Sequence, residues 1–274
     1  MRDMSSRPAH PAASAPRAAP AAPSRLARLA RLAWLAGAAA LLLAPGWGEA
    51  AERAHRGHGE LGTVLLDGQR TQVRWVDGDT FKVDSGPLQG FSTRLSGYNT
   101  LETFGPVHRI GAASPQALWA LAKAAAPLLA RTEWRCSTLG QRDGYGRALV
   151  ACPEAAAMLV RAGQAMVFAV EGPADPALLA AQREAQAARA GLWAGGVPPE
   201  LLSSLHAAGE KGLGAKGAYD RVVDTRTGKA TARPHRRAYA TCQEVCLDAG
   251  PLPSCMTYVP YERRYHDRPA CLAP

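Results

Sequence analysis

Alternating apolar and polar positions mark the part of the chain that follows residue 60. Val73 and Trp75, for example, alternate with polar neighbours, and a period of two is typical of half-buried strands. Asp-Gly dipeptides at 67–68 and 77–78 indicate turns between such strands. Closely spaced short strands predict a small twisted barrel or sandwich. The predicted strands are Thr63–Leu66, Thr71–Val76, Thr80–Val83 and Ser92–Leu95.

A helical period follows these strands. Ser114-Pro115 has the residue types of an N-cap and a first helical position, and Pro127 is expected to end or kink the helix that begins there. Two more helices are predicted, over Glu154–Ala162 and from Asp175-Pro176 to Gly191. Strand candidates at Thr132–Cys136 and Ala148–Cys152 lie between the first and second helices. The order of elements predicts an α+β domain.

The character of the sequence changes after Pro198-Pro199. Residues 207–240 are rich in Gly, Ala and Lys with weak periodicity, and the last 35 residues carry Cys, Pro and Tyr. We therefore expect a folded domain over residues 51–198 and a separate, loop-rich, disulfide-containing C-terminal extension over residues 199–274.

The first fifty residues resemble a secretory signal. A stretch of Ala, Pro, Ser and Arg leads to three arginines, then an apolar run from Leu32 to Ala44 and the small-residue exit Gly48-Glu49-Ala50. The alternative is an uncleaved anchor, but the uncharged stretch Leu32–Gly48 has 17 residues, short of the roughly 20 that span a bilayer. We expect cleavage near Ala50, no stable membrane association afterwards, and a secreted or periplasmic protein.

Composition and charge narrow the class of protein only a little. With 47% apolar and 20% charged residues, the chain is globular rather than a coiled coil, a collagen-like fibre or a disordered protein. The net charge of +9 invites a nucleic-acid interpretation, but +4 of it lies in residues 1–50. Basicity alone therefore decides nothing about the partner.

The six cysteines agree with export to an oxidising compartment. Cys136 and Cys152 flank a turn-bearing segment between candidate strands, which suits a cross-strand disulfide. The other four lie near the C-terminus, where a zinc site with His235 and His266 is the alternative to disulfides. Disulfides are favoured, and their pairing stays open. The four cysteines are Cys242, Cys246, Cys255 and Cys271.

Three polar clusters carry candidate chemistry. Asp77-Gly78-Asp79-Thr80 gathers two carboxylates at a turn, which suits a hard cation such as Ca²⁺. Arg94 and Glu102 are separated by a bend that contains Gly97. The third cluster, Arg142-Asp143-Gly144-Tyr145-Gly146-Arg147, has glycines that permit a tight turn.

Together and in this order, the clusters resemble the staphylococcal nuclease-like (thermonuclease) family, whose signature is Asp-Gly-Asp-Thr, then Arg-Leu with Asp-Thr-Pro-Glu, then Asp-Lys-Tyr-Gly-Arg. The likeness runs from about Val73 to Trp193 and includes the ending Gly191-Leu192-Trp193. It implies a five-stranded OB-fold barrel with three helices. The extension is not covered.

The resemblance also implies a role for each residue. Arg94 and Arg147 match phosphate-clamping arginines, and Glu102 matches the general base for the attacking water. Tyr145 matches a substrate contact. The implied substrates are DNA and RNA, with unpaired strands favoured and 3′-phosphate ends left. The implied Ca²⁺ ligands are Asp79, Asn99 and the Thr100 carbonyl, with Asp77 in the outer shell.

Three substituted residues and a set of missing aromatic positions depart from the family pattern. Asn99 replaces a ligating Asp and so removes one negative charge, which is expected to weaken metal binding. Leu101 replaces a Pro and Gly144 a phosphate-contacting Lys, and the aromatic positions that pack on the base are missing near 168–171. His108 is either a loop histidine or a residue that reaches the metal or a phosphate.

If the three clusters converge on one site, we expect an exported, monomeric hydrolase.

 That hydrolase is a metal-dependent phosphodiesterase that cleaves DNA or RNA, with Ca²⁺ as its expected ion. The alternative is an OB-fold protein that binds a strand without cutting it. The reason to consider it is Asn99, which replaces a charged metal ligand. A third interpretation makes the extension an adhesion or partner module with the barrel as its scaffold.

Overall fold

The computed structural model describes residues 59–211, 213, 217–248, 251–266 and 268–272. All of them belong to one compact unit, Gly48–Pro274. The signal sequence expected over residues 1–50, with its cleavage near Ala50, lies outside the described residues. Within the described residues, no helix is both long and apolar enough to cross a membrane.

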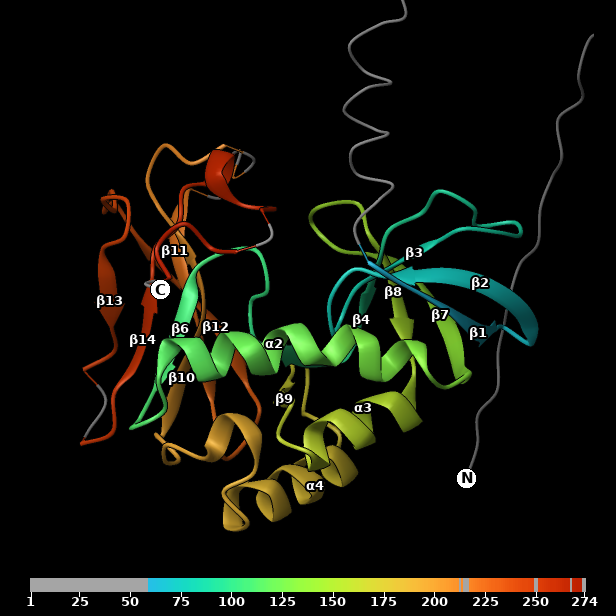
Figure 1. Ribbon diagram of the computed structural model, residues 1–274, viewed down its shortest axis with the longest axis horizontal. Coiled ribbons are helices and arrows are strands. Elements are labelled where there is room, and N and C mark those ends of the chain that lie inside the picture. Colours follow the sequence, from blue (N-terminus) through green and yellow to red (C-terminus); the bar gives the residue numbers. More distant parts are fainter. Residues whose placement is uncertain (1–58, 212, 214–216, 249–250, 267, 273–274) are drawn as a thin grey trace, which may run out of the picture. The chain divides into compact units, whose positions relative to one another are not determined.

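A barrel-like sheet forms one side of the unit (Figure 1). Its strands pair in the order β3-β2-β1-β7-β8-β4, and a bridge between Lys82 and Ser92 brings the two outer strands together, so the sheet is nearly closed. This confirms the predicted OB-fold-like barrel, with six paired strands where five were expected. The strands are β1 (Glu60–Leu66), β2 (Gln69–Trp75), β3 (Phe81–Val83), β4 (Thr93–Leu95), β7 (Trp134–Arg142) and β8 (Ala148–Ala151).

The alternation seen in the sequence places the barrel core. Val73 and Trp75 of β2 are fully buried, while Gln72 before them is exposed and Arg74 between them is only half-buried. Asp67 and Gly68 join β1 to β2 with φ values of 49° and 81°, which are the left-handed conformations that a two-residue hairpin turn requires. The predicted disulfide Cys136–Cys152 is present in the barrel wall.

Three helices accompany the barrel, as the sequence predicted: α2 (Pro115–Ala130), α3 (Pro153–Arg161) and α4 (Pro176–Ala187). The Ser114 hydroxyl accepts a hydrogen bond from the Ala117 amide at 3.2 Å and caps α2. Pro127 does not end α2, which continues to Ala130. So close to the helix end a proline removes only one backbone bond, and the buried Leu129 packs against the core.

The C-terminal extension, residues 199–274, is also built on strands. One sheet contains β10 (Glu200–His206), β11 (Ala218–Asp224) and β12 (Ala230–His235) in that order. A second sheet contains β13 (Glu244–Cys246), β14 (Ser254–Thr257) and β6 (Val107–Ile110). Because β6 precedes Pro198 and β14 follows it, backbone pairing crosses the expected domain boundary. The remaining elements are the β5–β9 pair, Gly97–Thr100 with Ala165–Phe168, and the short η1 (Gly191–Trp193) and η3 (Tyr261–Arg263).

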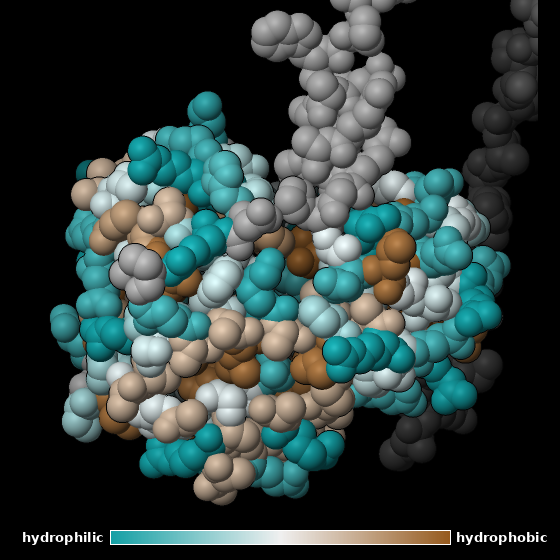
Figure 2. Space-filling view, in the orientation of Figure 1, coloured by the Kyte–Doolittle hydropathy of each residue, from teal (hydrophilic) through white to brown (hydrophobic). Residues whose placement is uncertain are grey.

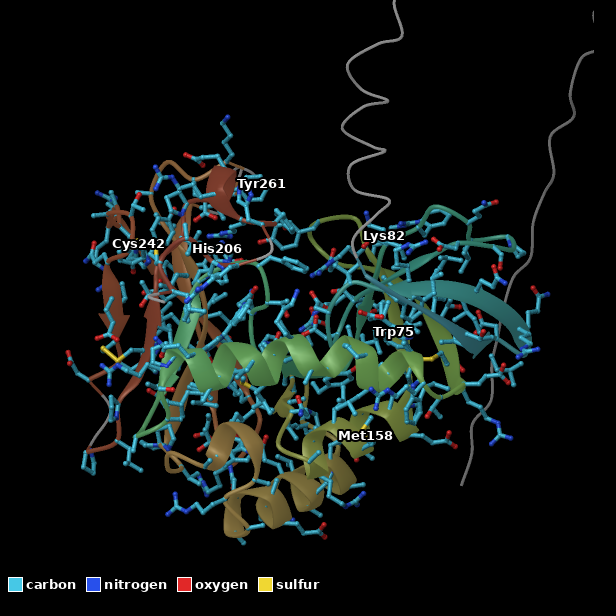
Figure 3. The ribbon with its side chains drawn as sticks, in the orientation of Figure 1. Trp75, Lys82, Met158, His206, Cys242 and Tyr261 are labelled. Carbon is cyan, nitrogen blue, oxygen red and sulfur yellow. A yellow bond between two sulfur atoms is a disulfide. The ribbon has the colours of Figure 1, made fainter. Side chains whose placement is uncertain are left out.

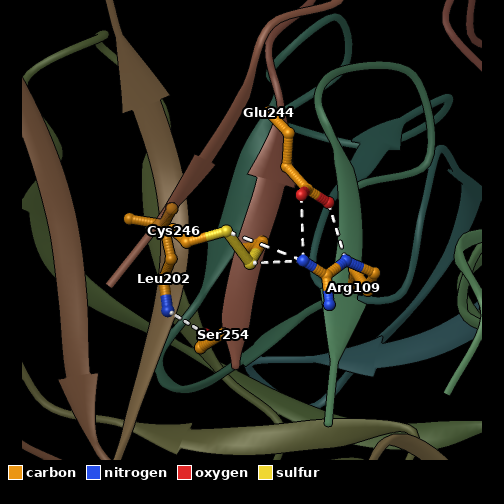
Figure 4. The surroundings of a disulfide bond; sticks show 6 residues. Arg109, Leu202, Glu244, Cys246 and Ser254 are labelled. Atoms are coloured by element: carbon orange, nitrogen blue, oxygen red, sulfur yellow. Dashed lines mark hydrogen bonds and ion pairs between the residues drawn. A yellow bond between two sulfur atoms is a disulfide. The ribbon is translucent and has the colours of Figure 1, made fainter. Parts of the chain in front are cut away.

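A bidentate ion pair reinforces the sheet that crosses the boundary. Arg109 of β6 donates from Nε and Nη2 to the Glu244 carboxylate at 2.7 and 2.9 Å, and the Cys246–Cys255 disulfide lies beside its guanidinium (Figure 4). Glu244 and these two sulfurs lie close enough to suggest a metal site, but the sulfurs are bonded to each other. The zinc alternative with His235 and His266 is wrong too, because all four C-terminal cysteines are in disulfides.

The cysteines that the sequence left unpaired form Cys242–Cys271 and Cys246–Cys255. None of the six cysteines, all of which are described, is free. Disulfides of this kind are typical of proteins that fold in an oxidising, extracellular-type environment.

The extension shares a hydrophobic core with the residues before it. Leu201 of β10 and Val223 of β11 are buried in one cluster with Leu101, Met166 and Trp193. Helix α2 runs across both parts, from β6 at one end to β1 and β2 at the other (Figure 1). Figure 2 shows apolar side chains gathered across the middle of the same face, over α2. Much of the apolar surface that holds the extension in place is thus contributed by the preceding domain.

Candidate active site

All the candidate catalytic, metal-binding and substrate-binding residues line one cleft of about 1300 Å³. The distant polar clusters of the sequence therefore converge. The barrel and β5 supply most of one wall, and residues of the extension supply much of the other, including His206 and Tyr261 (Figure 3). The predicted residues on the cleft are Asp77, Asp79, Arg94, Asn99, Thr100, Glu102, Tyr145 and Arg147.

The turn between β2 and β3 brings its carboxylates to the base of the cleft. The Asp79 amide donates to the Asp77 carboxylate at 3.0 Å and fixes the turn. Gly78 is required by close packing, because a Cβ there would lie 2.7 Å from the Ala125 Cβ and closer still to the Thr100 side chain. The Tyr98 hydroxyl donates to the Gly78 carbonyl at 2.9 Å. Sequence and packing thus hold this turn in one position.

Asp79 is the most heavily bonded carboxylate of the site. Its Oδ2 accepts from the Thr100 amide at 2.8 Å and from the Thr100 hydroxyl at 3.0 Å, and its Oδ1 pairs with the Arg94 guanidinium. Burial works to raise the pKa of Asp79, but the Arg94 charge and the Thr100 hydrogen bond outweigh it and hold that pKa below its usual value. Asp79 is therefore ionised at neutral pH.

Asp77 has the opposite electrostatic balance. Burial, followed by the nearby Asp79 charge, raises the pKa of Asp77 to about 7. The neighbouring Arg94 therefore only partly neutralises the negative charge of the two carboxylates at the base of the cleft. Two oxygen ligands in a negative environment fit a hard divalent cation.

Hydrogen bonds to other residues of the protein hold the Asn99 side chain in place. Its Oδ1 accepts from Arg94 Nη2, and its amide donates to the Thr100 carbonyl at 2.7 Å. Both oxygens that the resemblance assigns to the metal at this point, that of Asn99 and that of the Thr100 backbone, are therefore engaged in hydrogen bonds. Both Asp79 oxygens are engaged as well, so what favours the carboxylates of Asp77 and Asp79 as cation ligands is their negative charge.

Glu102 lies in the loop that follows β5 and is half-buried. Burial raises the pKa of Glu102, and the positive charge of Arg264, a residue of the extension, works in the opposite direction. No donor among the described residues is within hydrogen-bond distance of its carboxylate, so both oxygens are available to a water molecule. A Cβ at Gly105 would lie 3.3 Å from Glu102 Oε2.

Arg147 is positioned by its own turn. The Asp143 carboxylate accepts from the Arg147 amide at 3.0 Å and from Arg147 Nε at 2.7 Å. The Arg147 guanidinium lies 5.7 Å from the centre of the Tyr145 ring. The side chain of Arg147 is 30% exposed, against 12% for Arg94. Both arginines are fixed by a carboxylate, but Arg147 is the more accessible.

His108 does not join the site. It lies in β6 rather than in a loop, is 2% exposed, and is not among the residues that line the cleft. Neither ring nitrogen has a hydrogen-bond partner among the described residues, and burial lowers the pKa of His108 to about 4. It is therefore a neutral core residue.

Sequence reasoning missed the wall that the extension provides. Tyr219 and Arg221 of β11, and Arg264 after η3, all line the cleft. Tyr219, Val222 and Val223 are residue types that favour strands and would have indicated one here, but nothing in them says which surface the strand faces. Phe168, near which the family's aromatic positions are missing, lies between Arg94 and Arg221, whose guanidinium carbons are each 5.8 Å from its ring centre.

Residues 94–195 match the family model described as staphylococcal nuclease homologue. The matched range contains Arg94, Glu102 and Arg147, begins after Asp77 and Asp79, and ends before the extension. No curated protein matches the chain.

Proposed function

Because residues 94–195 form a domain of the staphylococcal nuclease homologue family, we propose that this protein hydrolyses phosphodiester bonds in DNA or RNA. The observation that carries the proposal is the convergence of Arg94, Glu102 and Arg147 on a single cleft. Two guanidinium groups and one half-buried carboxylate with available oxygens are what water attack on a phosphodiester requires.

In the proposed reaction, Glu102 acts as the general base. Its carboxylate accepts a proton from a water molecule while the water oxygen forms a bond to phosphorus. The bond from phosphorus to the 5′-oxygen breaks, and that oxygen takes up a proton from solvent, which leaves a 3′-phosphate and a 5′-hydroxyl. General-base assistance of this kind contributes roughly 10²–10⁴-fold to the rate.

Arg94 and Arg147 are proposed to stabilise the negative charge that develops on the phosphate oxygens. Their planar guanidinium groups suit bidentate contacts with phosphate. Asp79 and Asp143 hold the two arginines before substrate arrives, so little reorganisation is needed as the charge develops. Tyr145, stacked near Arg147, is proposed to contact the substrate.

Ca²⁺ is the proposed cofactor, held by Asp79 with Asp77 in or near its water shell and with help from the Asn99 and Thr100 oxygens. The raised pKa of Asp77 supports this assignment, because a divalent cation would relieve the repulsion between the two carboxylates. When bound, the ion supplies positive charge beside the phosphate. Since Asn99 is neutral and bonded to Arg94, the proposed affinity is weaker than that of a site with a third carboxylate.

A second candidate function is strand binding without cleavage. The engagement of Asn99 by Arg94 favours it, because that contact ties together a ligand position and a phosphate-clamping residue. We place the protein outside the cytoplasm, secreted or periplasmic, on the strength of its disulfides, and we propose that it is a monomer.

The test is incubation of the purified mature protein with plasmid and with single-stranded DNA and RNA, first with Ca²⁺ and then with a chelator. Cleavage that needs the ion and leaves 3′-phosphate ends is the expected result. A folded sample that cleaves nothing with any divalent ion, yet binds single strands, would favour the second candidate.

A further inference from the structure

The extension forms the wall of the cleft that faces the candidate catalytic residues. Arg221 is the residue of this wall whose contacts say most about what the wall could bind. Arg221 lies on β11, is half-buried and lines the cleft. Its guanidinium carbon is 5.8 Å from the centre of the Phe168 ring and 5.4 Å from that of Tyr219. No carboxylate among the described residues is within ion-pair distance of it.

Arg221 belongs to the same group of side chains as Arg94 and Arg147. It shares the Phe168 ring with Arg94. The Arg147 guanidinium lies by Tyr145, whose hydroxyl is 3.4 Å from the Tyr219 hydroxyl on the extension. Two aromatic bridges thus connect three arginines across the cleft.

On the extension side, no carboxylate among the described residues balances the positive charge of this group of arginines. Arg94 is paired with Asp79 and Arg147 with Asp143, whereas Arg221 rests on aromatic rings. Its guanidinium retains N–H donors for an anion, since contact with a ring face does not use them. An arginine in this position is suited to a phosphate beside the one that Arg94 and Arg147 would hold.

Exposed apolar side chains mark the same cleft. Of the large apolar side chains exposed in the described part of the chain, all but Leu61 line it. Tyrosines at such positions offer ring faces to unpaired bases, which a duplex keeps stacked inside. Tyr265 is 47% exposed and stacks on Phe104 at 5.8 Å. The exposed set on the cleft is Leu139, Tyr145, Val170, Tyr261 and Tyr265.

We propose that the C-terminal extension is part of the substrate-binding site, in which Arg221 binds a phosphate adjacent to the scissile one and exposed tyrosines stack on the bases of an unpaired strand. This proposal rests on the proposed function for the position of the scissile phosphate. It predicts tighter binding of a strand with more than one phosphate than of a dinucleotide with one, and it assigns the preference for unpaired nucleic acid to both walls.

The test compares Arg221→Gln with Arg226→Gln, a matched control in which the exposed arginine lies on the same extension but not on the cleft. Affinity for a short single-stranded oligonucleotide is measured with chelator present, so that no cleavage occurs, over a range of salt concentrations. Arg221→Gln should bind on the order of tenfold more weakly, and the slope of log K against log salt should fall by about 0.7. Wild-type and Arg226→Gln should agree.

Cleavage assays separate this proposal from the proposed function. Arg221→Gln should raise the KM for a single-stranded oligonucleotide with kcat retained, and should leave the cleavage of a dinucleotide with one phosphodiester unchanged. Equal losses on both substrates would overturn the proposal, because Arg221 would then act on the scissile phosphate. If the wild type cleaves and Arg221→Gln matches it in affinity and KM, the proposal fails while the nuclease function stands.

If the wild type binds but does not cleave, the nuclease function fails and the affinities still decide the role of Arg221. If the wild type neither binds nor cleaves, both fail. Should Arg221→Gln not fold, Arg221→Lys carries the test. It keeps the charge, so the salt slope should equal that of the wild type, while the loss of the planar fork should weaken binding severalfold. Unchanged affinity would overturn the proposal.

Discussion

The two walls of the cleft hold their arginines in different ways. On the barrel side, Arg94 and Arg147 are each fixed by a carboxylate, Asp79 and Asp143. On the extension side, Arg221 lies on aromatic rings. A donor that is fixed in advance is worth most where charge develops during a reaction, whereas a donor on a ring face is free to meet an incoming anion. This difference fits the proposal that the reaction takes place at one wall and that both walls bind the strand.

The largest effect on kcat is expected at Glu102. A large loss there would place the reaction on the barrel side of the cleft. Glu102→Gln should lower kcat by roughly 10²–10⁴-fold, because the amide cannot accept the proton of the attacking water. Affinity for a single strand should stay near that of the wild type. The control is Glu171→Gln, which changes an exposed carboxylate on the same cleft. Equal losses in the two variants would break the comparison.

The two barrel arginines should differ from each other in stability. Arg147→Gln is expected to lower kcat by about 10²–10³-fold with little change in Tm, because its side chain is 30% exposed. Arg94→Gln should lower kcat similarly and also reduce the free energy of unfolding by roughly 3 kcal/mol, since it leaves the buried Asp79 carboxylate without its cation. Single-turnover rates and thermal melting measure the two effects. A large stability loss in Arg147→Gln would mean that Arg147 is structural.

His108 tests the junction between the extension and the residues before it, because its strand, β6, pairs with β14 of the extension. Burial holds the pKa of His108 at about 4 in the folded protein, whereas an unfolded histidine titrates near 6.5. Below pH 6.5 the unfolded state therefore binds one more proton, and stability falls as the pH drops from about 6.5 to 4. The shift is worth roughly 3 kcal/mol at the acid end of that window.

His108→Leu should remove this share of the acid sensitivity and leave stability at pH 8 unchanged or higher, since neither ring nitrogen is hydrogen-bonded to a described residue. Denaturant unfolding at several pH values measures it. The pKa of His206 is also lowered to about 4, by burial and by Arg264 and Arg221. The acid sensitivity that His206 contributes should therefore remain in the variant. An unaltered pH profile in the variant would contradict the buried, neutral assignment of His108.

The smallest effect is expected at Asn99. Asn99→Asp restores a carboxylate beside Asp79 and should tighten Ca²⁺ binding on the order of tenfold, because affinity follows ligand charge. Calorimetry with Ca²⁺ measures the change. Unchanged affinity, with the new carboxylate paired only to Arg94, would show that position 99 supports the arginine rather than the ion.

The sequence predicted what depends on local signals. Ser114 and Asp175 cap helices where expected, and the glycine of the Asp77–Thr80 turn lies where no Cβ fits. The candidate site residues were proposed because three short motifs kept their order, and the structure brings them to one cleft that their spacing did not reveal. Local signals gave no sign that Pro127 would be carried within α2, because the packing of Leu129 at the helix end is a tertiary effect.

The extension was harder to predict, because its place depends on pairing across long stretches of chain. Met256 pairs with His108, and Cys255 with Arg109, and no local pattern in either segment names its partner. Arg221 has ordinary strand neighbours in the sequence, and its relation to Phe168 exists only after β9 and β11 are both in place. The orientation of the Asn99 amide likewise depends on Arg94 rather than on the Asn99 sequence context.

The pairing of β6 with β14 has a consequence for biosynthesis. A ribosome makes β6 before every strand of the extension, and the strand that completes its sheet, Ser254–Thr257, emerges only after β13. Contacts of such long sequence separation form late and slowly. The candidate cleft is therefore assembled only after β14 has been made, at the stage when oxidation of Cys246 and Cys255 secures the partner strands.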